Sequence, residues 1–164
     1  MIFVTLGSQK FQFDRLLKKI DELIEKGIIT DEVFAQIGSS TYIPQKYKYT
    51  RFMDREEFSD YIERSSLVIT HGGTGVIIGA VKKGKKVIAV PRLAKYGEHV
   101  DDHQLQLLHQ FDELGIICSC FDLERLDECY HEVQNKEYKS YVSNTRVIMD
   151  SIEEFLEMTE KNRK

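Results

Sequence analysis

The sequence predicts an α/β fold in which a doubly wound, Rossmann-like parallel sheet of about six strands is covered by helices on both faces. Two observations lead to this prediction. Short, continuously apolar segments alternate along the chain with longer segments in which apolar residues recur every three or four positions. The short segments also lack the alternation of a half-exposed strand, which indicates strands buried on both faces, as in parallel sheets.

The first part of the chain supplies three of these strands. Residues 2–6 (IFVTL) are a strand, and residues 13–27 follow it with apolar residues at helical spacing and a glycine at the end. Residues 33–38 (VFAQIG) and 47–53 (YKYTRFM) are expected as further strands. A short helix is expected over 56–65.

The middle of the chain continues the same alternation. Residues 66–73 form a strand that ends in glycines, and 76–83 form the helix after it. Residues 86–91 are the next strand, followed by a helix that ends at a glycine over 100–115. IICSCF, at 116–121, is the last expected strand. Right-handed crossovers between such units give a doubly wound sheet.

The last part of the chain is expected to be helical. One helix is predicted over 123–135 and a long one over 139–164. A chain of 164 residues is long enough for one domain with a proper core and too short for two. We therefore expect residues 1–164 to be a single domain.

Composition narrows the class of protein. With 41% apolar and 30% charged residues the chain is typical of globular proteins, and its net charge of −4 argues against nucleic acid as a partner. The N-terminus lacks signal-peptide character, and no apolar run approaches the roughly 20 residues that span a bilayer. Three cysteines without a C-x-x-C pair fit a reducing, cytoplasmic compartment. Cys118 and Cys120 are expected to be buried on one face of a strand.

A glycine-rich loop stands between the strand at 66–73 and the next helix. Gly72, Gly73 and Gly75 can bring bare backbone N–H groups against an anion at a helix N-terminus, and Thr74 can cap the helix or donate to a phosphate oxygen. The alternative is that the glycines only make a tight turn. No G-K-[ST] follows, and the loop is not G-x-G-x-x-G, so neither a nucleoside-triphosphate loop nor a nicotinamide fold is favoured.

A polar segment follows the neighbouring strand, at the edge where parallel strands present ligands. His103 and Gln104 are suited to hydrogen-bond sugar hydroxyls, whereas helix capping is the simpler explanation for Asp101 and Asp102. A metal site using His99 and His103 is the alternative. The segment lacks the glutamate of H-E-x-x-H, and we expect no metal.

The motifs T-H-G-G-T-G and V-P-R…E-H…D-D-H-Q resemble the donor-binding, C-terminal half of family 28-type GT-B glycosyltransferases. The chain is most similar to small, stand-alone versions of that half. These include the soluble subunit of the eukaryotic two-component UDP-GlcNAc transferase of dolichol-linked glycan synthesis, and bacterial capsule and exopolysaccharide subunits. The resemblance covers nearly the whole chain and implies a UDP-sugar site.

The resemblance also implies roles for individual residues. The glycine loop would hold the pyrophosphate, the loop at 7–8 would close over it, and the polar segment would meet the sugar. The implied nucleotide-sugar-binding residues are Gly7, Ser8, Gly72, Gly73, Thr74, Gly75, Arg92, Glu98, Asp101, Asp102, His103 and Gln104. Such enzymes are typically inverting and metal-independent, so no cofactor is expected. Relatives carry an acidic ribose-binding residue where this chain has Gly79, and Glu98 is the substitute considered.

A complete GT-B enzyme has a second domain that brings the acceptor. The resemblance therefore implies a membrane-anchored partner that recruits this chain to the cytoplasmic face of the membrane and supplies a lipid-linked saccharide. Galactose in β-1,4 linkage, for a capsular or exopolysaccharide, is the transfer expected, with UDP-GlcNAc or UDP-glucuronate as alternative donors. His71 and His99 are candidate catalytic bases, although the base could lie on the partner. The alternative function is a non-catalytic UDP-sugar-binding or regulatory module. A hydrolase is disfavoured because no G-x-S-x-G elbow is present.

Overall fold

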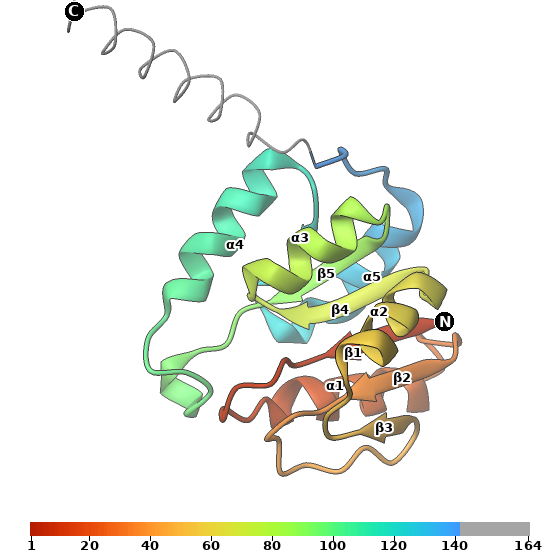
Figure 1. Ribbon diagram of the computed structural model, residues 1–164, viewed down its shortest axis with the longest axis vertical. Helices are drawn as coiled ribbons and strands as arrows, with labels where there is room; N and C mark the ends of the chain where they lie inside the picture. The colour runs from red at the N-terminus through yellow and green to blue at the C-terminus, as the bar shows by residue number, and fades with distance from the viewer. Residues whose placement is uncertain (142–164) are drawn as a thin grey trace, which may run out of the picture.

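The computed structural model describes residues 1–141 and contains one six-stranded sheet with the strand order β3-β2-β1-β4-β5-β6 (Figure 1). Every pair of neighbouring strands is parallel. The predicted doubly wound α/β sheet is therefore confirmed. The helix expected over 139–164 lies almost entirely outside the described residues.

The elements follow the predicted alternation of strand and helix. In chain order they are β1 (Ile2–Thr5), α1 (Asp14–Glu25), β2 (Val33–Gln36), β3 (Lys48–Thr50), α2 (Arg55–Arg64), β4 (Leu67–His71), α3 (Thr74–Lys82), β5 (Lys86–Val90), the 3₁₀ turn η1 (Ala94–Tyr96), α4 (His103–Leu114), β6 (Cys118–Ser119), the 3₁₀ turn η2 (Leu123–Arg125) and α5 (Leu126–Asn135).

The sheet separates two hydrophobic cores because successive strand side chains point to opposite faces. Ile2 and Val4 of β1 pack in the core that includes α1 and α5, whereas Phe3 packs in the core that includes α2, α3 and α4. Burial on both sides explains why these strands are continuously apolar in sequence.

The two edge strands are shorter than predicted. β3 contains only Lys48–Thr50 of the expected 47–53, and β6 only Cys118–Ser119 of the expected 116–121. An edge strand pairs on one side only, so fewer of its residues are held in a ladder. Cys118 and Cys120 are both buried in the core that includes α1 and α5, as predicted, although Cys120 lies just after the end of β6.

Two helix starts differ from the sequence-based expectation. Gly73 is the N-cap of α3 and Thr74 is its first helical residue, so Thr74 does not cap this helix. Helix α4 begins at His103, which leaves Asp101 and Asp102 in the segment before it. Because β1, β4 and β5 are neighbours, the segments that leave their carboxyl ends meet at one rim of the sheet.

Candidate functional site

The loop between β4 and α3 leaves backbone N–H groups uncapped at the centre of this rim. Among residues 1–141 no side chain caps α3, and the N–H of Gly73 donates back to the carbonyl of His71 at 2.8 Å. The first-turn N–H groups of a helix have no intrahelical acceptor, and the positive end of the helix dipole lies beside them. Thr74 and Gly75 are exposed there. This arrangement suits an anion such as a phosphate group.

The imidazole of His71 lies between the two glycine loops. A Cβ on Gly73 would lie 2.3 Å from His71 Cε1, and a Cβ on Gly7 would lie 2.8 Å from His71 Nε2. Gly7 also has a φ of +72°, which side chains rarely adopt. Steric contact with one buried ring therefore requires glycine at both positions. The structure brings the loop at Gly7 and Ser8, with Ser8 exposed, to the loop at Gly73.

His71 is neutral at physiological pH. Burial, reinforced by the nearby positive charge of Arg92, lowers the pKa of His71 to about 3. A base this weak is a poor proton acceptor at neutral pH. The geometry therefore favours His71 as the packing support of the glycine loops over the catalytic role considered from sequence.

The candidate residues Glu98 and Gln104 face the protein interior. Glu98 is 1% exposed, and its two carboxylate oxygens accept from Arg15 Nε at 2.6 Å and from the N–H of Leu93 at 3.0 Å. Gln104 Oε1 accepts from the N–H groups of Gly72 and Arg92. Both Glu98 oxygens and the Gln104 carbonyl oxygen therefore already accept hydrogen bonds from the protein itself.

The segment before α4 is exposed and held by its own aspartates. Asp101 Oδ1 accepts from the N–H of His103 at 3.0 Å, and the same oxygen lies 3.1 Å from His99 Nδ1. The His103 N–H holds the pKa of Asp101 below its ordinary value. Asp102 does not cap α4 but accepts from the N–H of Ala94 at 2.8 Å. Capping therefore accounts for Asp101 only, and Asp101, Asp102 and His103 stand exposed beside the glycine loop.

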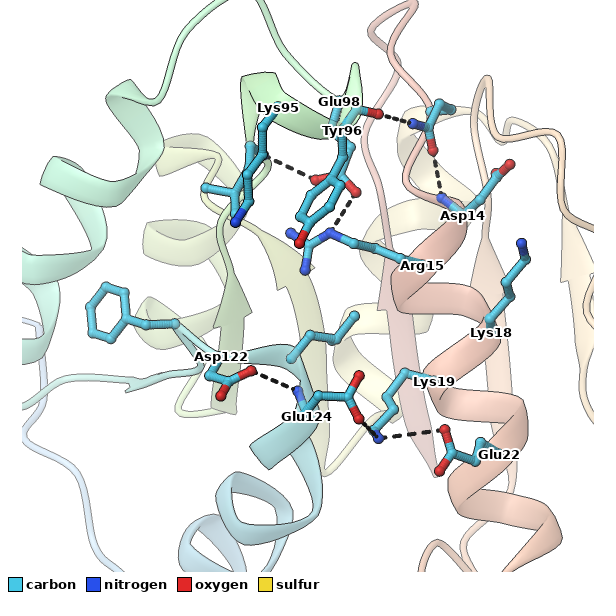
Figure 2. A pocket seen from close by; sticks show the side chains of 14 residues that line it. Asp14, Arg15, Lys18, Lys19, Glu22, Lys95, Tyr96, Glu98, Asp122 and Glu124 are labelled. Atoms are coloured by element: carbon cyan, nitrogen blue, oxygen red, sulfur yellow. Dashed lines mark hydrogen bonds and ion pairs between the residues drawn. The ribbon is translucent and has the colours of Figure 1, made fainter.

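A cavity lies beside the glycine loops, not over them. It has a volume of about 740 Å³ and lies between α1, the segment 93–98 and the segment 121–124 (Figure 2). Two ion pairs connect its walls: Arg15 Nε lies 2.6 Å from Glu98 Oε1, and Lys19 Nζ lies 2.7 Å from Glu124 Oε2. None of the glycines of the anion site lines this cavity.

Two findings concern metal-ligand groups and membrane-spanning helices. Within residues 1–141, no group of three or more His, Cys, Asp or Glu side chains is arranged to hold a metal ion. His99 bonds to Asp101 and packs on the ring of Phe11, with ring centroids 4.9 Å apart. Across the same described residues, every helix is too short or too polar to cross a bilayer.

Sequence reasoning missed the contacts that hold the site together. The Arg15–Glu98 pair joins residues 83 positions apart, and the Gln104–Gly72 bond joins residues 32 apart. No local pattern marks such pairs. The one available signal was the burial expected of Gln104, which lies on α4 four residues before the core residue Leu108.

Comparison with known proteins identifies the family of this chain. Residues 1–158 match the glycosyltransferase family 28 C-terminal domain. The human UDP-N-acetylglucosamine transferase subunit ALG13 is 25% identical over 128 residues, which cover 73% of this chain but only 11% of that protein. The chain thus spans about a tenth of the length of this relative.

Solved structures share the fold. An NMR structure of ALG13 matches with a TM-score of 0.58 and 21% identity, covering 92% of this chain and 93% of that one. The crystal structure of the kitacinnamycin glycosyltransferase matches with a TM-score of 0.60 and 17% identity, covering 82% of this chain and 35% of that one. This fold therefore also occurs as about a third of a longer chain.

Proposed function

The chain belongs to the glycosyltransferase family 28 C-terminal domain family and is thus a donor-binding glycosyltransferase domain, and from this premise we propose that it binds a UDP-sugar for transfer. Residues 1–164 act in this proposal as one nucleotide-sugar-binding domain. The observation that carries it is the uncapped N-terminus of α3, where backbone N–H groups and the helix dipole face an exposed, glycine-lined rim.

In this proposal the diphosphate lies on the β4–α3 loop, at Gly72, Gly73, Thr74 and Gly75. Gly7 and Ser8 close over it from the β1–α1 loop. The sugar faces the exposed segment with Asp101, Asp102 and His103. Glu98 is assigned to the fold instead of to ribose, because both of its oxygens bond within the protein.

The proposed reaction is inverting and needs no metal ion. Negative charge develops on the leaving diphosphate as the glycosidic bond breaks, and fixed donors directed at that charge stabilise the transition state. The backbone N–H groups of the α3 N-terminus are such donors. They are positioned by the fold before the substrate arrives and need no further ordering during the reaction.

The proposal also includes a partner chain and an acceptor. The human relative is named as a subunit of a transferase, which supports assembly with a second chain. We assign to that chain a membrane anchor, the binding of a lipid-linked saccharide and recruitment of this protein to the cytoplasmic face. Galactose in β-1,4 linkage for a capsular or extracellular polysaccharide is the proposed transfer, and UDP-GlcNAc or UDP-glucuronate are the other donors to test.

The first experiment is a calorimetric titration with UDP in EDTA, comparing the wild type with Gly75→Asp. A Cβ on Gly75 meets nothing within 4 Å, and an acidic side chain at a helix N-terminus is tolerated, so the variant is expected to fold. Its carboxylate would occupy the anion site and repel the diphosphate. Saturable wild-type binding that Gly75→Asp abolishes supports the proposal.

The neutral variant Gly75→Asn is the matched control, since it has nearly the size of aspartate without the charge. It is expected to bind UDP more tightly than Gly75→Asp. Equal UDP affinity in the wild type and Gly75→Asp would place the nucleotide elsewhere and contradict the proposal.

A second function is favoured by the state of His71. His71 is buried with a pKa lowered to about 3, which makes it too weak a base at neutral pH, whereas the Asp101 carboxylate on Nδ1 of His99 leaves Nε2 of that ring free to accept a proton. A weak base at His71 favours a module that binds UDP-sugar and completes a catalytic partner without doing chemistry itself. Transfer by the assembled complex that survives both His71→Gln and His99→Gln would support this alternative.

A further inference from the structure

The side-chain amide of Gln104 connects two segments of the rim. Its Oε1 accepts from the N–H of Gly72 at 3.1 Å and from the N–H of Arg92 at 3.0 Å. Gly72 begins the loop after β4, and Arg92 lies in the segment that follows β5. Gln104 is only 7% exposed, so these bonds form away from competing water.

The orientation of this amide is determined by its partners. Two backbone N–H groups point at one atom, which must be the acceptor oxygen and not the NH₂ group. The NH₂ group then lies 3.4 Å from His71 Nδ1. A neutral His71 with its proton on Nε2 offers Nδ1 as an acceptor, so the amide and the ring fit in one arrangement.

Arg92 extends the connection to the other glycine loop. Its guanidinium Nη2 donates to the carbonyls of Leu6 at 2.7 Å and of Phe11 at 3.3 Å, which flank the loop that begins at Gly7. Arg92 is 1% exposed, and its Nε and Nη1 have no partner among the described residues. The backbone of Arg92 is thus held by Gln104, while its side chain holds the β1–α1 loop.

We propose that Gln104 is a positioning residue: by accepting from Gly72 and Arg92 it holds both glycine loops in the arrangement that receives the diphosphate. This inference rests on the proposed function. Its physical basis is preorganisation, because loops that are already ordered lose less conformational freedom when a ligand binds. In this role Gln104 affects the binding of UDP itself and makes no contact with the sugar.

The competing role is direct contact of Gln104 with a sugar hydroxyl. The two roles predict different affinities for UDP without sugar when Gln104 is replaced. A positioning role predicts weaker binding of UDP without sugar, whereas a sugar contact predicts unchanged UDP affinity and a loss confined to the nucleotide sugar. In the structure the Oε1 of Gln104 already accepts two backbone hydrogen bonds, which favours positioning.

The test compares Gln104→Met with Gln106→Met in the full chain. Both make the same change on α4, but Gln106 is exposed, so it controls for the substitution itself. We expect Gln104→Met to bind UDP roughly ten-fold more weakly, as loss of two buried hydrogen bonds implies. Gln106→Met is expected to bind as the wild type does. Unchanged UDP affinity in Gln104→Met with weaker UDP-sugar binding would overturn the inference.

Amide hydrogen exchange supplies a readout that general destabilisation does not mimic. In Gln104→Met the amides of Gly72 and Arg92 are expected to lose protection selectively, while those in the centre of the sheet keep theirs. Gln104→Glu retains an acceptor oxygen and is expected to keep both amides protected. If Gln104→Met does not fold, Gln104→Glu decides, since loss of both protections there would contradict the role.

The exchange measurement also separates this inference from the proposed function. If wild-type protein does not bind UDP, the proposed ligand is wrong. Selective loss of protection at Gly72 and Arg92 would still show that Gln104 holds the two loops. If UDP binds but those two amides exchange alike in wild type and Gln104→Met, the positioning role alone fails.

Discussion

At the scale of single residues, the glycines of the rim are not equivalent. Gly73 has an ordinary φ of −77°, so its need for glycine comes from contact with His71 and not from backbone strain. Gly75 meets nothing within 4 Å of an added Cβ. One glycine therefore makes room for a ring, while the other leaves open space in front of backbone donors.

This difference predicts opposite effects of the same substitution on stability. Gly73→Ala forces a methyl group against His71 and is expected to lower the free energy of unfolding by about 1–3 kcal/mol. Gly75→Ala meets no atom and should leave stability unchanged or raise it by up to about 1 kcal/mol, because alanine favours helix. Urea denaturation measures both, and equal losses would contradict the contact with His71.

His71 predicts a pH dependence of stability. Burial and Arg92 lower the pKa of His71 from 6.5 to about 3, so between these pH values the unfolded chain binds a proton that the folded chain does not. The free energy of unfolding must therefore fall as the pH falls through this window, by at most about 1.4 kcal/mol per pH unit from this group.

The measurement is urea denaturation from pH 7.5 to 5. We expect His71→Gln to flatten the slope relative to the wild type, whatever its stability at pH 7.5. His131→Gln, at an exposed site on α5, should keep the wild-type slope and serves as the control. Identical slopes in the wild type and His71→Gln would mean that His71 titrates alike in the folded and unfolded chains.

At the scale of elements, the local sequence pattern predicted the central strands correctly but not the ends of the edge strands. Strands β1, β4 and β5 were predicted correctly because they are buried on both faces of the sheet, and such strands have continuously apolar sequences. The edge strands β3 and β6 were drawn too long, since their pairing depends on one distant neighbour. The position of the glycine loop was also predicted correctly, because its glycines directly follow an apolar strand in the local sequence.

The pairing of elements across the rim had no such signal. Glu98 was considered for ribose because it is acidic and near the loop, yet it joins α1 to the segment after β5 through Arg15. A charged residue in a sequence does not reveal its partner 83 positions away. Gln104 was likewise expected to face a sugar, and in the structure it faces backbone.

The Arg15–Glu98 pair predicts that Glu98→Ala weakens the attachment of this segment to α1. The Glu98 side chain is 1% exposed and that of Arg15 is 22% exposed, so removing one partner leaves a poorly solvated charge. We expect a loss of about 2–4 kcal/mol in the free energy of unfolding. Glu128→Ala breaks the exposed pair with Arg125 and should cost less than about 1 kcal/mol. Similar losses in both would show that burial of the first pair is unimportant.

At the scale of the whole molecule, residues of the rim where the donor is proposed to bind, among them Thr74, Gly75 and His103, are exposed. The kitacinnamycin glycosyltransferase is nearly three times as long as the part this chain matches, since the match covers 35% of it. In this chain the described residues supply the proposed anion site, and of the two histidines considered as bases His71 is too weak at neutral pH.

If the acceptor is bound by a second chain, as proposed, this chain should bind UDP-sugar alone but should not transfer the sugar alone. The purified chain is expected to bind UDP-sugar and to release almost no UDP from it, because donors that stabilise a leaving diphosphate do little without a positioned acceptor. Membranes that contain the proposed acceptor-binding partner should carry out transfer when the wild-type chain is added, but not when Gly75→Asp is added. A UDP-release assay measures both, with Gly75→Asn and membranes lacking the partner as controls. Rapid UDP release by the chain alone would mean that it carries a complete catalytic site, and the assignment of the acceptor to a second chain would then be wrong.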